Sequence, residues 1–217
     1  GDMGIGMNDW MCPGLKWGES YQPDRGDVLS KEDLEKIEVF HRYVDARGDG
    51  IAARTLPGTH PKGAYFTRGS GHNMYGAYTE DASEYQQVVD RLLVKWDTAK
   101  DMVPTPIIES DSNTIGFISI GSCDHAVREA RDELADSGVT SDYMRIRAFP
   151  FSQAVQDFID SHDRIYIVEQ NRDSQLRSLM RLELKLDDSK IKSILHYNGL
   201  PMTAGFVTDA VNQDLAR

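Results

Sequence analysis

The chain has 217 residues, of which 40% are hydrophobic and 27% are charged. This composition is typical of a folded globular protein and excludes a disordered tail. Acidic residues (35) outnumber basic residues (24), which gives a formal net charge of -11. Because phosphate binding depends on clustered cations, this balance argues against a nucleic-acid partner.

The sequence also carries signals about its compartment. It contains no apolar run of the roughly 18 residues that a membrane-spanning helix needs, and it does not open with a secretory signal. The two cysteines, Cys12 and Cys123, lie far apart and without the spacing of a disulfide framework or a zinc site. We therefore expect a cytoplasmic protein with no membrane partner.

Residues 1–80 read as a loop-rich linker segment. Gly, Pro, Asp and Trp are frequent, and a helical pattern follows Ser30, over Lys31 to Phe40, with Ser30 as its N-cap. The opening stretch "GDMGIGMNDWMCPGLKW" has no initiating methionine and no strand pattern. We therefore expect the segment to leave a domain that precedes it in a longer protein.

Residues 81–111 should form a long amphipathic helix and a connector. Asp81 is the expected N-cap, and Glu84 is the expected partner in a capping box. Apolar residues recur at three- and four-residue spacing, which places them on one stripe. A stripe of this kind needs a partner surface, because burying each large side chain stabilises by about 1.5–3 kcal/mol. The stripe consists of Tyr85, Val88, Val89, Leu92, Leu93, Trp96 and Ala99.

Residues 112–217 alternate strand and helix patterns, which indicates βαβ units around a parallel sheet. The fold class is α/β, an open and mostly parallel sheet with helices on both faces. The expected strands are Ile115 to Ile120, Met144 to Ala148, Ile165 to Val168 and Ile194 to His196. The expected helices carry Ala126, Val127, Ala130 and Leu134, then Val155, Phe158 and Ile159, then Leu176, Leu179 and Met180.

The turn Gly121-Ser122-Cys123 joins the first of these strands to a helix, where α/β proteins often hold their chemistry. A catalytic cysteine in a nucleophile elbow needs glycines on both sides, but the downstream position is His125, and no later histidine lies in a motif for the base. A dinucleotide fingerprint needs three glycines, and only Gly121 is present. A small residue packed at a turn is the favoured interpretation of Cys123.

Two stretches of the loop-rich segment contain chemically suggestive residues. Gly48-Asp49-Gly50, followed later by Asn73, is similar to the Mg²⁺-binding pattern of thiamine diphosphate (TPP) enzymes, but the prolines and glycines between them cannot form the helix that this pattern requires. Arg68, His72 and Asn73 could together bind a carboxylate. The alternative is a loop ordered by hydrogen bonds against a neighbouring subunit.

A third polar cluster follows the strand "IYIVE". Glu169, Gln170, Asn171 and Arg172 come at the carboxyl end of a parallel strand, where ligands and partners bind in this architecture. They could form a site. Alternatively, Asp173 or Ser174 caps the next helix and the others are solvated.

Six strings, in this order, resemble the C-terminal half of the alpha subunit of 2-oxoacid:ferredoxin oxidoreductases, particularly the 2-oxoglutarate type. They are "FTRGSGHNMYGAYTED", "VVDRLLVKWDTA", "ISIGSCDHAVREA", "DYMRIRAFPFS", "IYIVEQNRDSQLRSL" and "SILHYNGLP". The resemblance covers essentially the whole chain and implies that residues 112–217 are a transketolase C-terminal-like domain preceded, in the full subunit, by a pyrimidine-type domain.

The resemblance also implies a function. Members oxidatively decarboxylate a 2-oxoacid to an acyl-CoA and reduce ferredoxin, with TPP, Mg²⁺ and an iron–sulfur cluster in the complete enzyme. The beta subunit carries the diphosphate, the Mg²⁺ and the cluster, which agrees with the two cysteines here, too few for four thiolate ligands. Within this segment we therefore expect no catalytic, cofactor-binding or metal-binding residue.

The expected work of the segment is assembly and orientation of the active site. Its partners would be the beta subunit, the missing pyrimidine-type domain and, for the complex, ferredoxin. The residues expected near the substrate are Arg68, His72 and Asn73, and those expected at a subunit interface are Glu169, Asn171, Arg172 and Gln175. The alternative is a stand-alone module, which either binds a 2-oxoacid through Arg68 and His72 or serves subunit interaction.

Overall fold

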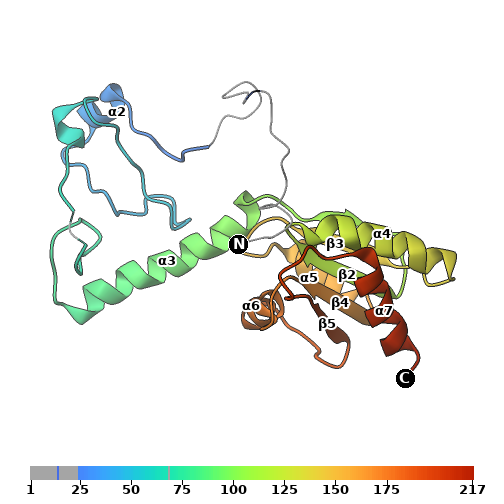
Figure 1. The fold of residues 1–217 in the computed structure, drawn as a ribbon. Helices are drawn as coiled ribbons and strands as arrows, with labels where there is room; N and C mark the ends of the chain where they lie inside the picture. The colour runs from blue at the N-terminus through green and yellow to red at the C-terminus, as the bar shows by residue number, and fades with distance from the viewer. Residues whose placement is uncertain (1–13, 15–23, 68) are drawn as a thin grey trace. The chain divides into compact units, whose positions relative to one another are not determined.

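The computed structural model describes residue 14, residues 24–67 and residues 69–217. These form two compact units. The first, called the loop unit, ends at Met102, and the second, called the α/β unit, begins at Val103. The helices and strands, most of which are labelled in Figure 1, are α2 (Lys31–Lys36), η1 (Pro61–Gly63), α3 (Ala82–Met102), β1 (Ile107–Glu109), β2 (Ile115–Ile120), α4 (Cys123–Asp136), β3 (Asp142–Ile146), α5 (Gln153–Asp160), β4 (Arg164–Glu169), α6 (Gln175–Glu183), β5 (Ile191–Leu195) and α7 (Ala204–Leu215).

The sheet of the α/β unit has five strands in the order β1-β3-β2-β4-β5. The strands β3, β2, β4 and β5 are parallel to their neighbours, and β1 pairs with β3 in the antiparallel direction. The predicted fold class, an open and mostly parallel sheet with helices on both faces, is therefore confirmed. The predicted boundary at residue 112 is too late, because β1 already belongs to this sheet.

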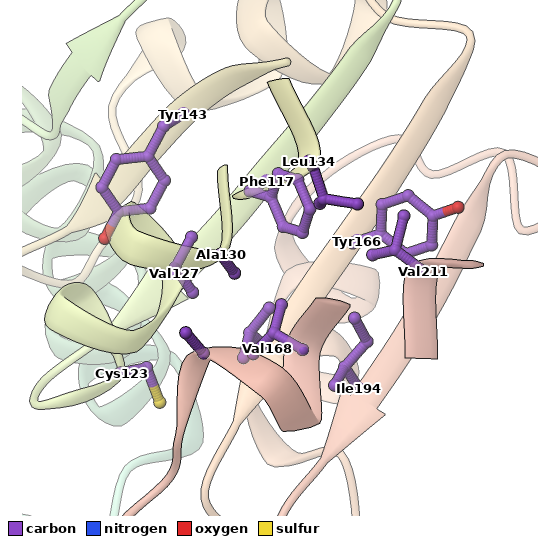
Figure 2. Packing of buried hydrophobic residues seen from close by; sticks show 12 residues of the cluster. Phe117, Cys123, Val127, Ala130, Leu134, Tyr143, Tyr166, Val168, Ile194 and Val211 are labelled. Carbon is purple, nitrogen blue, oxygen red and sulfur yellow. The ribbon is translucent and has the colours of Figure 1, made fainter. Parts of the chain in front are cut away.

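Two hydrophobic clusters fill the two sides of the sheet. Helices α4 and α7 pack on one face, where Phe117 and Tyr166 stack with their ring centroids 5.3 Å apart (Figure 2). Helices α5 and α6 pack on the other face, against Ile118, Met144 and Ile167. Strands buried on both faces explain the continuous apolar runs of the sequence.

The expected strands and helices of this unit are present, with shifted ends. The strand predicted from Met144 begins at Asp142, and the strand predicted from Ile194 begins at Ile191. Two elements were not predicted, the edge strand β1 and the final helix α7. The missed helix is central to the fold, because Val207 and Val211 are fully buried in the cluster beneath it.

The loop unit contains few regular elements, as predicted. Ser30 caps α2 and forms a capping box with Asp33, but the helix ends at Lys36 rather than at Phe40. Helix α3 spans the predicted stripe. Asp81 accepts hydrogen bonds from the N–H groups of Ser83 and Glu84, at 2.9 and 3.0 Å. The predicted return bond of the capping box is wrong, because Thr79 accepts the hydrogen bond of the Asp81 N–H.

Candidate functional site

The topology of the α/β unit indicates where a ligand would be expected. Strands β2 and β4 are neighbours, and the helices that follow them, α4 and α6, lie on opposite faces of the sheet. In open α/β sheets this is the switch point, and ligands bind outside the carboxyl ends of the two strands. The predicted cluster from Glu169 to Gln175 lies at this position, because β4 ends at Glu169.

Glu169 itself closes the N-terminus of α6. Its side chain is 1% exposed. One carboxylate oxygen accepts a hydrogen bond from the N–H of Leu176 at 2.6 Å, and the other accepts one from the N–H of Arg177 at 3.2 Å. The amide of Asn171 donates a further bond at 2.8 Å. An anionic ligand would use the same N–H groups, so the protein's own carboxylate occupies that position.

The remaining residues of the cluster divide into inward-facing and exposed ones. The side-chain oxygen of Asn171 accepts hydrogen bonds from the N–H groups of Asp173 and Gln175, both at 3.1 Å, and so shapes the turn. Arg172 is exposed and donates to both carboxylate oxygens of Asp173, at 2.7 and 3.2 Å. Gln175 is also exposed. Only Arg172 and Gln175 of the four predicted interface residues therefore present their side chains fully to a partner.

The structure corrects the predicted cap of α6. In one of the two interpretations Asp173 or Ser174 caps this helix, but the Ser174 backbone has a left-handed conformation (φ 52°) and its side chain makes no capping bond. The Ser174 hydroxyl instead donates to Glu169 at 3.3 Å. A glutamate that is distant from the helix start along the chain replaces the local cap.

The turn after β2 is bonded to the turn after β4. The Gln170 amide donates a hydrogen bond to the Ser122 hydroxyl at 2.6 Å, which joins the two loops at the switch point. Cys123 is 1% exposed and lies in the hydrophobic cluster under α4 (Figure 2). A buried thiol in apolar surroundings suits the predicted packing role and not a nucleophile.

A charged network surrounds Asp124, the second residue of α4, whose side chain is 9% exposed. Its carboxylate accepts hydrogen bonds from the Tyr143 hydroxyl at 2.8 Å and from Arg128 at 2.9 Å, and Arg145 lies 3.2 Å away. Burial alone would raise the pKa of Asp124, but the bonds from Tyr143 and Arg128 and the charge of Arg145 outweigh it and lower the pKa.

This network also ties the edge strand to the helix. Arg128 and Arg131 both form ion pairs with Glu109 of β1, the second with a separation of 2.9 Å. The network therefore fixes β1 and α4 in place. Sequence reasoning missed it, although Asp124 and Arg128 have the four-residue spacing of a helical ion pair.

A second buried polar pair lies at the amino ends of the strands, away from the switch point. Asp142 opens β3, and its carboxylate accepts hydrogen bonds from the Ser110 hydroxyl, from the N–H groups of Asp111 and Asn113, and from the Asn113 amide at 2.6 Å. Nε2 of His162 lies 3.3 Å from the same carboxylate. Burial would raise the pKa of Asp142, but the hydrogen bonds lower it to about 2.

The residues predicted near the substrate belong to the loop unit. Arg68 lies outside the described residues. The His72 ring stacks on Tyr43 with 4.2 Å between the ring centroids, and its Nδ1 lies 2.9 Å from the Asn73 carbonyl oxygen. The Asn73 side-chain oxygen accepts hydrogen bonds from the N–H groups of Tyr75 and Ala77, both at 3.1 Å. His72 and Asn73 thus order their own loop.

The Gly48-Asp49-Gly50 turn serves to dock a helix. The Asp45 carboxylate accepts hydrogen bonds from the N–H groups of Gly48 and Gly50, at 2.8 and 2.7 Å. Arg91 of α3 donates to the Gly50 carbonyl at 2.6 Å, and a Cβ on Gly50 would lie 2.1 Å from a backbone nitrogen of that helix. This close approach explains the glycine without a metal. Among the described residues, no group of three or more His, Cys, Asp or Glu side chains could hold a metal ion.

The comparisons with known proteins point in one direction. No family model matches the chain. It is 25% identical over 203 residues to the alpha subunit of 2-oxoacid:ferredoxin oxidoreductase 2 from Aeropyrum pernix, which covers 91% of this chain and 31% of that subunit. It is 22% identical over 199 residues to the 2-oxoacid:ferredoxin oxidoreductase subunit alpha of Saccharolobus solfataricus, which covers 89% of this chain and 30% of that subunit.

A solved structure has a similar fold. A chain of the 2-oxoglutarate:ferredoxin oxidoreductase from Magnetococcus marinus, solved with 2-oxoglutarate, coenzyme A and succinyl-CoA bound, has a TM-score of 0.74, 21% identity, and covers 87% of this chain and 32% of that chain. The predicted resemblance to alpha subunits of this kind is therefore confirmed over about nine tenths of the chain. The chain spans about a third of the length of the curated relatives it matches. Within the part of the chain that the structure describes, no helix is long and apolar enough to cross a membrane.

Proposed function

We propose that this chain is the C-terminal part of the alpha subunit of a TPP-dependent 2-oxoacid:ferredoxin oxidoreductase, of the type that acts on 2-oxoglutarate. The observation that carries the proposal is the match to two curated alpha subunits, which runs through both the loop unit and the α/β unit. The reaction converts a 2-oxoacid and coenzyme A to carbon dioxide and an acyl-CoA, and it transfers two electrons to ferredoxin.

The share of this segment in that reaction is assembly. The described residues offer no donor set for Mg²⁺ or for an iron–sulfur cluster, and Glu169 fills the helix terminus that a diphosphate would need. In this proposal TPP, Mg²⁺ and the cluster are bound by the rest of the enzyme. The beta subunit, a pyrimidine-type domain and ferredoxin are the proposed partners.

Helix α3 supplies the main argument for an assembly role. None of its residues is buried, and its stripe presents large apolar side chains, with Tyr85 57%, Leu92 48% and Leu93 62% exposed. Burying such side chains stabilises by about 1.5–3 kcal/mol each, so a face of this size is suited to a protein surface. In this proposal the face packs against other parts of the oxidoreductase and helps to hold its active site in a fixed geometry.

Reconstitution tests the proposal. The 217-residue chain alone should neither bind TPP nor decarboxylate 2-oxoglutarate. When the remaining alpha-subunit portion and the beta subunit are added, 2-oxoglutarate and coenzyme A should drive the reduction of ferredoxin, and omitting this chain should abolish it. Turnover by the isolated chain, or full activity of the other parts without it, would refute the assignment.

A matched pair of variants tests the assembly role. Leu93→Lys places a charge on the apolar stripe, whereas Val94→Lys places the same charge off the stripe, at a residue that is also exposed (42%). Leu93→Lys should reduce co-purification with the other parts by tenfold or more, and Val94→Lys should change it little. Equal effects of the two substitutions would show that the stripe is not the interface.

The stand-alone 2-oxoacid sensor is tested by calorimetry. His72 and Asn73 already make hydrogen bonds within their own loop, so we expect no heat of binding when 2-oxoglutarate is titrated into the chain. Saturable binding that disappears in His72→Ala would favour the sensor.

A further inference from the structure

A cavity of about 280 Å³ opens at the carboxyl end of β5, the edge strand of the sheet. Its lining comes from the end of this strand, from the turn that follows it and from the first turn of α7. The lining residues are Leu195, His196, Tyr197, Asn198 and Phe206. The cavity is distinct from the switch point, whose helix terminus is closed by Glu169.

His196 is the polar group of this cavity. It is 6% exposed, and its backbone N–H donates to the Glu169 carbonyl at 2.9 Å, which fixes its position directly after the strand. The ring packs edge-on against Phe206, with 4.8 Å between the centroids. Neither ring nitrogen has a hydrogen-bond partner among the residues that the structure describes. The imidazole can therefore hydrogen-bond a ligand that enters the cavity.

The N-terminus of α7 is the second component. The first N–H groups of a helix have no intrahelical acceptor, and among the described residues the Thr203 hydroxyl accepts a hydrogen bond from that of Phe206, at 3.3 Å. The first turn of α7 contains no acidic residue. By contrast, Asp124 lies in the first turn of α4, and Glu169 accepts hydrogen bonds at the start of α6. The partial positive charge at the start of α7 is therefore available to an anion.

The walls of the cavity are aromatic. Phe206 is 38% exposed and Tyr197 is 64% exposed, so both rings have surface left to cover a ligand. The volume suits a molecule somewhat smaller than a drug-sized ligand.

We propose that this cavity binds a small organic anion, whose carboxylate or phosphate group contacts His196 and the N-terminus of α7 and whose flat apolar body packs against Phe206 and Tyr197. Two features at different places in the chain, a buried histidine after β5 and a helix start without an acid, converge on one cavity. The inference depends on this geometry alone and is independent of the proposed function.

Calorimetry on the full 217-residue chain tests the proposal, with phenyl phosphate and benzoate as probes at constant ionic strength. At least one probe should bind saturably, at least tenfold more tightly than inorganic phosphate or acetate, and phenol should not bind. Whichever probe binds more tightly identifies the preferred head group. Failure of both probes to bind saturably at millimolar concentration would overturn the proposal.

A pair of substitutions at Gly205 locates the site without disturbing the core. Gly205 is the second residue of α7, it is exposed, and a Cβ there would meet no atom within 4 Å. An aspartate suits the first turn of a helix, so Gly205→Asp should fold, yet its carboxylate would repel an anion. Gly205→Asp should weaken binding of the better probe at least tenfold, whereas the uncharged Gly205→Asn should bind nearly as the natural chain does. Equal binding by both variants would place the probe elsewhere and sink the proposal.

The histidine gives an independent signal. The ring resonances of His196 should move saturably with the probe, with the midpoint that calorimetry gives, and His196→Phe should abolish binding. His125→Gln is the control, because His125 is exposed in the first turn of α4, and this change should leave binding unaltered. Shifts at His125 but not at His196 would contradict the assignment.

Discussion

Helices α3 and α4 have similar patterns of apolar residues but different environments. Both carry apolar residues at three- and four-residue spacing. Helix α4 buries Val127, Ala130 and Leu134 against the sheet, whereas α3 buries none of its residues. Periodicity therefore predicts that a helix forms and which face is apolar, but what covers that face depends on elements elsewhere in the chain or in a partner.

The sharpest test of this contrast is a matched pair of leucine truncations. Leu134 of α4 is fully buried and Leu93 of α3 is 62% exposed. Leu134→Ala should lower the free energy of unfolding by about 2–5 kcal/mol, because it leaves a cavity in the core. Leu93→Ala should lower it by less than about 0.5 kcal/mol, as for other surface changes. Urea-induced unfolding followed by circular dichroism measures both, and comparable losses would show that α3 is already packed in the isolated chain.

A pair of glycines tests how firmly α3 is held in the loop unit. Gly48 and Gly50 both have positive φ, 75° and 77°, so alanine at either site should cost about 1–2 kcal/mol for the left-handed backbone. Only at Gly50 would the new Cβ also meet the backbone of α3, at 2.1 Å. Gly50→Ala should therefore lower the free energy of unfolding by about 3 kcal/mol. It should also speed amide hydrogen exchange at positions 48 and 50. If Gly48→Ala has the same effect, the close approach adds nothing.

Asp142 allows a test by pH. Its pKa is lowered from 3.8 to about 2 in the folded chain. The ionised carboxylate therefore adds to the free energy of unfolding above about pH 4, and this stabilisation is lost as the pH falls towards 2. The shift corresponds to about 2 kcal/mol. Asp142→Asn should be less stable than the natural chain by about this amount at pH 6, and the difference should shrink towards pH 2. Ser110, Asn113 and His162 surround the carboxylate.

The control for this experiment is an exposed carboxylate of the same unit. Asp209 lies on the exposed side of α7, so Asp209→Asn should leave the pH dependence of stability parallel to that of the natural chain. If Asp142→Asn also keeps the natural pH dependence, the low pKa of Asp142 does not contribute to stability.

Much of the α/β unit could be predicted from local pattern. Buried strands such as Ile115–Ile120 are continuous apolar runs, and the helices between them have clear stripes, so the fold class followed from the order of elements. Helix α7 was missed because its buried residues, Ala204, Val207 and Val211, are small and are mixed with polar ones. Strand β1 has three residues, too few for a periodic signal.

The candidate site could be located from sequence more easily than it could be interpreted. The carboxyl end of β4 was correctly expected to hold a polar cluster. The hydrogen bonds that Glu169 accepts from the N–H groups of Leu176 and Arg177 join residues seven and eight positions apart through a turn with a left-handed Ser174, and residue types do not encode that geometry. The network around Asp124 likewise depends on strand pairing, which brings Tyr143 and Arg145 beside α4.

The smallest expected effect concerns the loop around Asn73. Its side-chain oxygen accepts two backbone hydrogen bonds, from Tyr75 and Ala77, so Asn73→Ala should destabilise the loop by about 1 kcal/mol. Amide hydrogen exchange at Tyr75 and Ala77 should quicken about fivefold, while exchange in the core strands stays unchanged. Asn212→Ala is the control, because Asn212 is exposed on α7. If exchange in the core strands also quickened, the loop would be coupled to the α/β unit, and the two units would not be independent in stability.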